Sequence, residues 1–270
     1  MMEQDNVNAS VVWLSGAAQG IGRSVAGHLA AQGHTIWLSD INEEAVSRAA
    51  DEIQQTGGRA VGFRCDVTDE TDVKRAAQRI VDGAGRIDVL INSAGLVHVD
   101  PILELPYATW KRVMAVNTDG TMLAGTAAAR QMIKQEEHSS SGRRGMILNV
   151  GSPVAEWGRP RFAAYGASKA AVKHWTMSLA EAMIPEQIAV TLLYPGMVLD
   201  GMYKTIIAQE AALDGTNPEE LAAARASGAP SGRYQEPEEL GPFVQHLIST
   251  PGMSAAGQVV WTAPYMRSIQ

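Results

Sequence analysis

The sequence predicts an α/β protein built as one doubly wound parallel sheet with helices on both faces. About seven short apolar runs alternate with helical patterns along the 270 residues, and this alternation is typical of a parallel sheet that is covered on both faces. The first run passes directly into a glycine-rich turn, and no Pro/Ser-rich linker divides the chain. We therefore expect a single domain over residues 1–270, with a polar tail at residues 1–10.

The strands are expected where short apolar runs stand between turn residues. These runs are Val11–Ser15, Thr35–Ser39, Ala60–Arg64, Ile87–Ile91, Met146–Val150, Ile188–Tyr194 and Gln258–Thr262. Helical spacing of apolar residues lies between them, as in Glu43–Gln55, Asp69–Ala84 and Tyr107–Lys134. The polar stretch at residues 135–145 predicts a flexible surface loop. Right-handed crossovers then place a bound cofactor where the strand order reverses.

The first strand meets three glycines in the order Ser15-Gly16-Ala17-Ala18-Gln19-Gly20-Ile21-Gly22. A helix follows and stops at Gly33, a residue suited to a left-handed C-cap. Glycines let the backbone approach a pyrophosphate, which is favoured at the positive end of a helix. The spacing is Gly-x3-Gly-x-Gly rather than the Gly-x-Gly-x-x-Gly of most dinucleotide folds. An ordinary glycine-rich turn is the alternative interpretation.

Asp40 ends the second expected strand. An acidic residue about 20 residues beyond the glycines typically binds the ribose hydroxyls of the adenosine. Its carboxylate would repel a 2′-phosphate, and no Arg or Lys stands beside it, so the sequence favours NAD over NADP. Asp40 would otherwise cap the next helix, but Asn42 is the better cap because Glu43 and Glu44 follow it in the first turn.

Tyr165 and Lys169 stand four residues apart in a stretch that is rich in helix formers. Residues at this spacing share one face of a helix. A tyrosine begins with a pKa of about 10, and a nearby positive charge lowers that pKa. We expect a phenol with a lowered pKa that serves as general acid and base. Chance produces many Tyr/Lys pairs on helix surfaces, so the pair gains weight from the glycine-rich turn.

Composition excludes several classes of function. A net charge of −7 and a pI near 5.4 argue against a nucleic-acid surface, and no Lys/Arg run or membrane-length apolar run predicts a membrane contact. Cys65 is the single cysteine and is expected to be a small buried residue. The scattered histidines predict no metal site. The first residues resemble no secretory signal, so we expect a soluble cytoplasmic protein.

With these residues placed, the chain resembles the classical short-chain dehydrogenases/reductases over nearly its full length. The resemblance rests on the glycine segment, on Ser152 thirteen residues before Tyr165, and on further matching motifs. These are Cys65-Asp66-Val67, Asn92-Ser93-Ala94-Gly95, Val116-Asn117-Thr118-Asp119-Gly120 and Pro195-Gly196-Met197-Val198. The resemblance implies a Rossmann-type fold and an NAD-dependent oxidoreductase that interconverts a secondary alcohol and a ketone. It also implies a homo-oligomer, either a tetramer or a dimer.

The resemblance also implies roles for individual residues. Tyr165 would exchange the hydroxyl proton, and Lys169 would lower the pKa of Tyr165 and bind the nicotinamide ribose. Ser152 would bind the substrate oxygen, and Asn117 would hold a water that links Lys169 to solvent. The implied cofactor contacts are Ser15, Gly16, Gln19, Gly20, Ile21, Gly22, Asp40, Asp66, Val67, Asn92, Ala94, Gly95, Tyr165, Lys169, Pro195, Gly196 and Val198.

Each of these residues also has a purely structural interpretation. Ser152 would merely bond its own backbone at a strand end, Asn117 would be a satisfied amide in a helix, and Asp66 would belong to a turn or cap before Thr68. The fixed separations favour the functional interpretation for Ser152 and Asn117, as they do for Tyr165 and Lys169.

Among the departures from the family pattern, Asp200 and the C-terminal strand bear on the cofactor and on the assembly. Asp200 stands where many members carry a Thr that contacts the nicotinamide amide. A carboxylate there could accept from that amide, but pyrophosphate would repel it, so we expect Asp200 to point elsewhere and the affinity for cofactor to suffer. The C-terminal strand continues as Thr262-Ala263-Pro264-Tyr265 instead of Val-Asp-Gly-Gly, which makes the subunit contacts harder to predict.

The substrate segment is expected at residues 197–237, as a loop or lid. The candidate substrate contacts are Val154, Trp157, Met197 and Met202. Apolar residues of the segment would equally form the core side of lid helices. We expect a neutral, moderately apolar secondary alcohol or ketone, and sugars, steroids, cyclic alcohols and carrier-bound acyl groups are the alternatives. A cofactor-binding regulatory or scaffold protein on the same fold is the alternative function, and an NAD-using epimerase or dehydratase is a further one.

Overall fold

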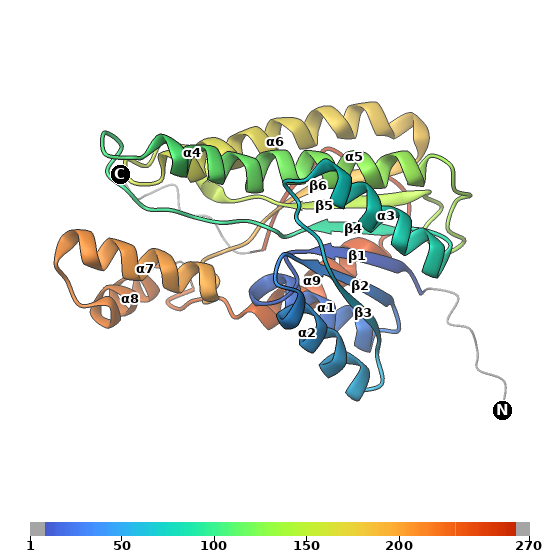
Figure 1. Cartoon of the computed structure of the whole chain (residues 1–270), viewed down its shortest axis with the longest axis horizontal. Helices are drawn as coiled ribbons and strands as arrows, with labels where there is room; N and C mark the ends of the chain where they lie inside the picture. The colour runs from blue at the N-terminus through green and yellow to red at the C-terminus, as the bar shows by residue number, and fades with distance from the viewer. Residues whose placement is uncertain (1–8, 230, 263–270) are drawn as a thin grey trace.

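A seven-stranded parallel sheet between two layers of helices makes up the protein (Figure 1). The computed structural model describes residues 9–229 and 231–262. The strand order is β3-β2-β1-β4-β5-β6-β7, and every neighbouring pair is parallel. The predicted doubly wound sheet is therefore confirmed. Most of the expected polar tail and the segment Ala263–Tyr265 lie outside the described residues.

Each expected strand lies within two residues of an observed one. The strands are β1 Val11–Ser15, β2 Thr35–Asp40, β3 Arg59–Arg64, β4 Val89–Asn92, β5 Gly145–Val150, β6 Ile188–Tyr194 and β7 Val259–Trp261. The α-helices are α1 Gly20–Ala31, α2 Glu43–Gln55, α3 Glu70–Ala84, α4 Tyr107–Met114, α5 Gly120–Met132, α6 Ala163–Met183, α7 Gly201–Asp214, α8 Pro218–Ser227 and α9 Leu240–Ser249.

The central strand β1 is buried on both of its faces. Val12 and Leu14 pack in the cluster that α1, α2 and α9 cover, whereas Trp13 packs in the cluster under α3, α5 and α6. This alternation follows from the two-residue period of a strand. The indole Nε1 of Trp13 donates to Ser39 Oγ at 2.9 Å, so burial leaves this polar atom satisfied. Figure 1 shows these two helix layers on opposite sides of the strands.

The helix expected over Tyr107–Lys134 is interrupted. A five-residue π-helical turn, Ala115–Asp119, separates α4 from α5, and the N–H of Gly120 donates to the carbonyl of Ala115. The predicted helical pattern is confirmed over this range, but the π-turn within it was not predicted, because apolar periodicity does not detect a single extra residue in a turn. Such π-turns occur often at functional sites, and this one contains Asn117.

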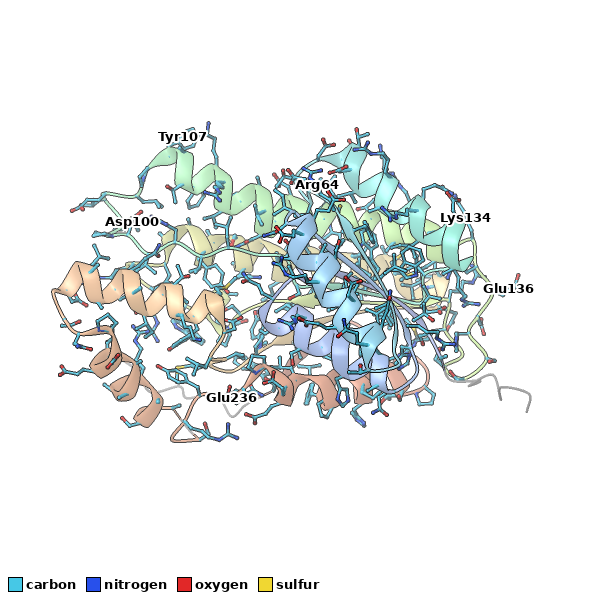
Figure 2. The ribbon with its side chains drawn as sticks, turned by 60° about the horizontal axis from the view of Figure 1, so that its bottom comes forward. Arg64, Asp100, Tyr107, Lys134, Glu136 and Glu236 are labelled. Carbon is cyan, nitrogen blue, oxygen red and sulfur yellow. The ribbon has the colours of Figure 1, made fainter. Side chains whose placement is uncertain are left out.

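The strand order reverses beside β1, which pairs with both β2 and β4. A crevice at the carboxyl ends of the strands is expected at this point. Helices α7 and α8 lie beyond these ends, on the left of Figure 1. Figure 2 shows Asp100 and Tyr107 at the same end of the molecule, and Lys134 and Glu136 at the opposite end.

The stretch at residues 135–145 has five exposed residues, and it also contains one buried cation. Arg143 is 3% exposed, and it donates to the carbonyls of Gly252 and Ile248 at 3.1 and 2.8 Å. Cys65 is buried, as expected. Among the described residues, no helix combines the length and the apolar character that crossing a membrane requires, and no cluster of His, Cys, Asp or Glu suits a metal ion.

Candidate active site

Four side chains that the sequence singled out lie at the carboxyl edge of the sheet. Ser152 follows β5, while Tyr165 and Lys169 stand on the first turns of α6. Ser152 lies near enough to the Tyr165 phenol to lower its pKa, and Lys169 Nζ lies 5.8 Å from the centre of the Tyr165 ring. Asn117 lies close by, because a methyl group placed on Gly95 would be 3.4 Å from Asn117 Oδ1 and 3.8 Å from Lys169 Nζ.

The pKa of Tyr165 departs from the sequence-based expectation. Burial raises it, Ser152 lowers it and the Asp200 carboxylate raises it, and together they give a pKa of about 12. The expected fall in pKa is wrong for this structure, because desolvation of the buried phenol outweighs the lowering by Ser152. Lys169 Nζ instead donates to the carbonyl of Val150 at 2.7 Å. Tyr165 therefore carries its proton at neutral pH.

Lys169 is only 5% exposed. Burial lowers its pKa from 10.5 to about 8, because removing an ammonium from water disfavours the charged form. At neutral pH the side chain is still mainly a cation, held against the end of β5 by Val150. The site thus presents a protonated phenol beside a cation, which are suitable groups for giving a proton to a substrate oxygen.

Asn117 is fully buried, and both polar atoms of its side-chain amide form hydrogen bonds. Its Oδ1 accepts from Leu96 N at 2.8 Å, and its Nδ2 donates to Leu96 O and to Ser168 Oγ at 2.9 Å each. The structural interpretation as a satisfied amide therefore holds for the side chain. These bonds fix the π-turn against α6 and against the segment after β4.

Ser168 is a residue that the sequence analysis missed. Its hydroxyl accepts from Asn117 Nδ2 and donates to the carbonyl of Tyr165 at 2.7 Å. The spacing could have indicated its role, since Ser168 lies three residues after Tyr165 and shares its buried helix face. Ser168 therefore links the helix that carries Tyr165 and Lys169 to the π-turn.

The glycine-rich turn fits a pyrophosphate in two respects. Gly16 and Gly20 have φ of 66° and 56°, a region that favours glycine. A methyl group on Gly16 would lie 2.5 Å from Ala94 Cα, and one on Gly22 would lie 2.5 Å from the carbonyl of Gly16. The N-cap residue Gln19 makes no side-chain capping bond, and the first turn of α1 has no acidic residue. The first N–H groups are therefore uncapped by described side chains, which suits an anion. Ile21 is half-buried and packs beside the core.

Asp40 ends β2 beside this turn. Its Oδ2 accepts from Ala18 N at 3.2 Å and its Oδ1 from Asn42 N at 3.0 Å. Asn42 is the N-cap of α2, as predicted. The carboxylate of Asp40 thus lies against the backbone of the glycine-rich turn, where an adenosine ribose is expected.

The Asp66 side chain stabilises the turn in which it stands. Its Oδ1 accepts from the N–H and the hydroxyl of Thr68 at 2.9 and 2.7 Å, so the turn interpretation is confirmed, whereas the N-cap of α3 is Asp69. Val67 packs against the start of α5, because a methyl group on Gly120 would lie 2.7 Å from Val67 Cγ2. This turn stands at the carboxyl end of β3.

The turn Asn92–Gly95 connects the glycine-rich turn to the four side chains. Asn92 Nδ2 donates to Asn149 Oδ1 at 2.9 Å. Ser15 Oγ lies 3.4 Å from Asn92 Oδ1 and 3.4 Å from Ala94 N, which are weak contacts. Neighbouring strands are therefore fixed to one another at the edge where the cofactor is expected.

The segment Pro195–Val198 follows β6 and is held from two sides. The N–H of Gly196 is shared by Gln235 Oε1 and Thr262 Oγ1 at 3.2 Å each, and both Pro195 and Val198 are buried. This turn leads directly into α7.

An apolar wall surrounds the Tyr165 ring. The cluster consists of Val97, Val99, Tyr165, Ile206, Val154, Phe162, Met202 and Tyr203. Two of the four candidate substrate residues, Val154 and Met202, belong to it. Met197 Sδ accepts from the Tyr203 hydroxyl at 3.3 Å, and Trp157 is half-buried but outside this cluster of described residues.

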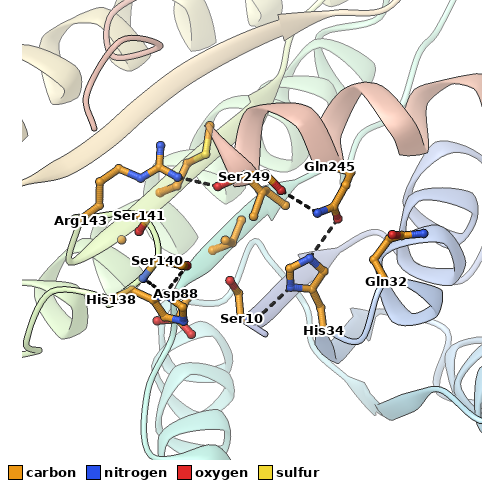
Figure 3. A pocket seen from close by; sticks show the side chains of 14 residues that line it. Ser10, Gln32, His34, Asp88, His138, Ser140, Ser141, Arg143, Gln245 and Ser249 are labelled. Atoms are coloured by element: carbon orange, nitrogen blue, oxygen red, sulfur yellow. Dashed lines mark hydrogen bonds between the residues drawn. The ribbon is translucent and has the colours of Figure 1, made fainter. Parts of the chain in front are cut away.

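A polar cavity of about 260 Å³ lies at the opposite, amino edge of the sheet (Figure 3). Its side chains bond to one another. His34 Nδ1 accepts from Ser10 N, His34 Nε2 lies 2.9 Å from Gln245 Oε1, and Gln245 Nε2 donates to Ser249 Oγ. Burial lowers the pKa of His34. These pairings indicate a structural role in joining α1, α9 and β1.

Comparisons with known proteins agree with this geometry. The short chain dehydrogenase family matches residues 10–211. A cyclopentanol dehydrogenase of Comamonas sp. (strain NCIMB 9872) is 33% identical over 245 residues, which cover 90% of this chain and 91% of that protein.

Two solved structures are similar over nearly the whole chain. NAD+-bound xylitol dehydrogenase has a TM-score of 0.86 and 30% identity, covering 96% of this chain and 99% of that one. A variant of actinorhodin polyketide ketoreductase with NADPH has a TM-score of 0.86 and 25% identity, covering 96% and 97%. The predicted family is confirmed: the chain belongs to the short chain dehydrogenases, oxidoreductases whose fold binds a nicotinamide cofactor.

Proposed function

We propose that the protein is an NAD(H)-dependent oxidoreductase that interconverts a secondary alcohol and a ketone. The observation that supports this most directly is the grouping of Ser152 and Lys169 around the Tyr165 phenol. This group stands at the carboxyl edge of the sheet, the edge at which the uncapped N-terminus of α1 also lies. A module that only binds a nucleotide would not need these side chains beside it.

The chain contributes proton transfer and orientation. In the direction of reduction, Ser152 donates a hydrogen bond to the substrate oxygen, and Tyr165, protonated at neutral pH, gives that oxygen its proton. The Lys169 cation stabilises the phenolate that remains, and Asn117 holds the helix turns that carry these groups in place through Ser168. The bound nicotinamide supplies or accepts the hydride.

NAD is the proposed cofactor because of Asp40. Its carboxylate lies against the glycine-rich turn, where it can bond a ribose diol and would repel a 2′-phosphate. The proposed nucleotide contacts are Ser15, Gly16, Gln19, Gly20, Ile21, Gly22, Asp40, Asp66, Val67, Asn92, Ala94, Gly95, Tyr165, Lys169, Pro195, Gly196 and Val198. Residues 197–237, which contain α7 and α8, act as the lid.

The apolar wall favours a neutral substrate with a compact hydrocarbon frame. Val97, Val99 and Val154 offer no hydrogen-bonding side-chain group to a polyol. A cyclic secondary alcohol such as cyclopentanol, the substrate in the name of one relative, suits such a wall better than xylitol.

The test is NADH formation across a panel of alcohols from cyclopentanol to xylitol, comparing wild type with Tyr165→Phe. We expect turnover to fall by about 10²–10⁴-fold in the variant, while NAD binding persists. Tyr107→Phe is the matched control, because Tyr107 is 72% exposed. Unchanged turnover in Tyr165→Phe would refute the proposed acid/base role, and NAD binding without turnover on the panel would favour the regulatory alternative.

A further inference from the structure

The first turn of α7 lies directly on the glycine-rich turn. Asp200 is the N-cap of α7, and its Oδ1 accepts from Tyr203 N at 2.9 Å. The other oxygen, Oδ2, faces Gly20, since a methyl group on Gly20 would lie 3.0 Å from it. The expectation that Asp200 points away from the pyrophosphate position is therefore wrong.

The next two residues extend this contact. A methyl group on Gly201 would lie 3.7 Å from Gln19 Oε1, and one on Gly95 would lie 3.6 Å from Met202 Cε. Residues 200–202 thus cover both turns at which the cofactor is expected, one for the pyrophosphate and one beneath the nicotinamide side. A dinucleotide held at these two turns would have to share this space with residues 200–202.

Asp200 brings a negative charge to this place. Within the part of the chain that the structure describes, no Lys or Arg forms an ion pair with it. Its field reaches Tyr165, whose pKa it raises. A pyrophosphate on the N-terminus of α1 would stand close to this carboxylate, and like charges in a partly buried site repel strongly.

The remainder of α7 is fixed to the protein. Gln209 Oε1 accepts from Val99 N at 3.0 Å, and Asp214 binds both terminal nitrogens of Arg161 at 2.8 and 2.6 Å. A movement that makes room for the nucleotide is therefore confined to the first turn of the helix, around Asp200.

Resting on the proposed cofactor function, we propose that Asp200 is a charge gate for the cofactor. The nucleotide binds only when the first turn of α7 moves the Asp200 carboxylate away from Gly20. The repulsion weakens the affinity for both NAD and NADP, and it speeds the departure of the nucleotide after turnover. Asp200 thus acts on the pyrophosphate that NAD and NADP share, and not on the 2′-position at which they differ.

The test compares wild type with Asp200→Asn by calorimetric titration with NAD and with NADP, and by stopped-flow release of NADH. Asparagine is as good an N-cap as aspartate, so the change removes the charge and keeps the helix start. For charges ~6 Å apart, effective dielectric constants from ~80 to ~20 give a change in Kd of about threefold to a hundredfold. We expect tighter binding of both nucleotides and slower release.

Asp82→Asn is the matched control, because it removes one exposed carboxylate on α3 at the far end of the sheet. Its Kd should equal that of wild type. Equal Kd values for wild type and Asp200→Asn would overturn the gate and leave the proposed function standing. Weaker binding by Asp200→Asn would also overturn the gate, since it would mean that the carboxylate contacts the nucleotide favourably. Absence of nucleotide binding by both proteins would refute the gate and the proposed function together.

Discussion

The buried ammonium of Lys169 should make the stability of the protein depend on pH. Its side chain is 5% exposed, and its charge lies against the carbonyl of Val150 at 2.7 Å. Burial lowers the pKa to about 8 from an ordinary value of 10.5. Replacing this residue by Met keeps a long unbranched side chain and removes the charge, so the perturbation isolates the titration of one group.

The direction of this pH dependence follows from how strongly the folded and the unfolded protein bind the Lys169 proton. Below pH 8, Lys169 is protonated in both the folded and the unfolded protein, and the full desolvation penalty is present. Between pH 8 and 10.5 the unfolded state binds the proton more strongly, so the free energy of unfolding rises with pH. At about 1.4 kcal/mol per pH unit, the whole interval amounts to about 3 kcal/mol, and the part up to pH 9.5 to about 2 kcal/mol.

Urea unfolding followed by circular dichroism at pH 7.5, 8.5 and 9.5, with no nucleotide added, measures this slope. Cys65 and Tyr165 have raised pKa values and lower the stability at high pH, but they do so in both proteins. The difference between wild type and Lys169→Met should therefore grow in favour of wild type by about 2 kcal/mol. Lys134→Met, at an exposed lysine, should show no such trend. A pH-independent difference for Lys169→Met would refute the reasoning.

Two further changes test the cofactor preference and the π-turn. Asp40→Ala should weaken NAD binding by about tenfold and relieve discrimination against NADP, as titration with both nucleotides would show; equal NADP and NAD turnover by wild type would contradict this. Asn117→Ala leaves both backbone polar groups of Leu96 without their partner and should lower the free energy of unfolding by about 2–5 kcal/mol in urea. A loss below about 1 kcal/mol would mean that these groups find other partners.

Almost all of the fold could be predicted from the sequence. Strands such as Val11–Ser15 and Ile188–Tyr194 were predicted at their observed bounds, because a buried parallel strand is a short apolar run with turn residues at each end. The glycine-rich turn was equally clear, since close packing at Gly16 and Gly22 excludes any side chain. These features depend on local chemistry, which a single sequence records.

The site was predicted less well where distant segments meet. The pKa of Tyr165 depends on burial by α7 and on Asp200, which is 35 residues away in the sequence. The position of Asp200 over Gly20 depends on how α7 packs, which periodicity does not specify. The burial of Arg143 depends on the carbonyls of Ile248 and Gly252. Each of these three features depends on how segments that are far apart in the sequence pack together.

The π-turn Ala115–Asp119 lets the two halves of one helical segment pack against different parts of the protein. Before it, α4 packs against α6, and after it, α5 packs against β4, β5 and α3. The extra residue changes the angular phase between the two halves, so the first half faces α6, which carries Tyr165 and Lys169, and the second half faces the sheet. The π-turn thus braces the proton-transfer helix against the core of the protein through one continuous helical segment.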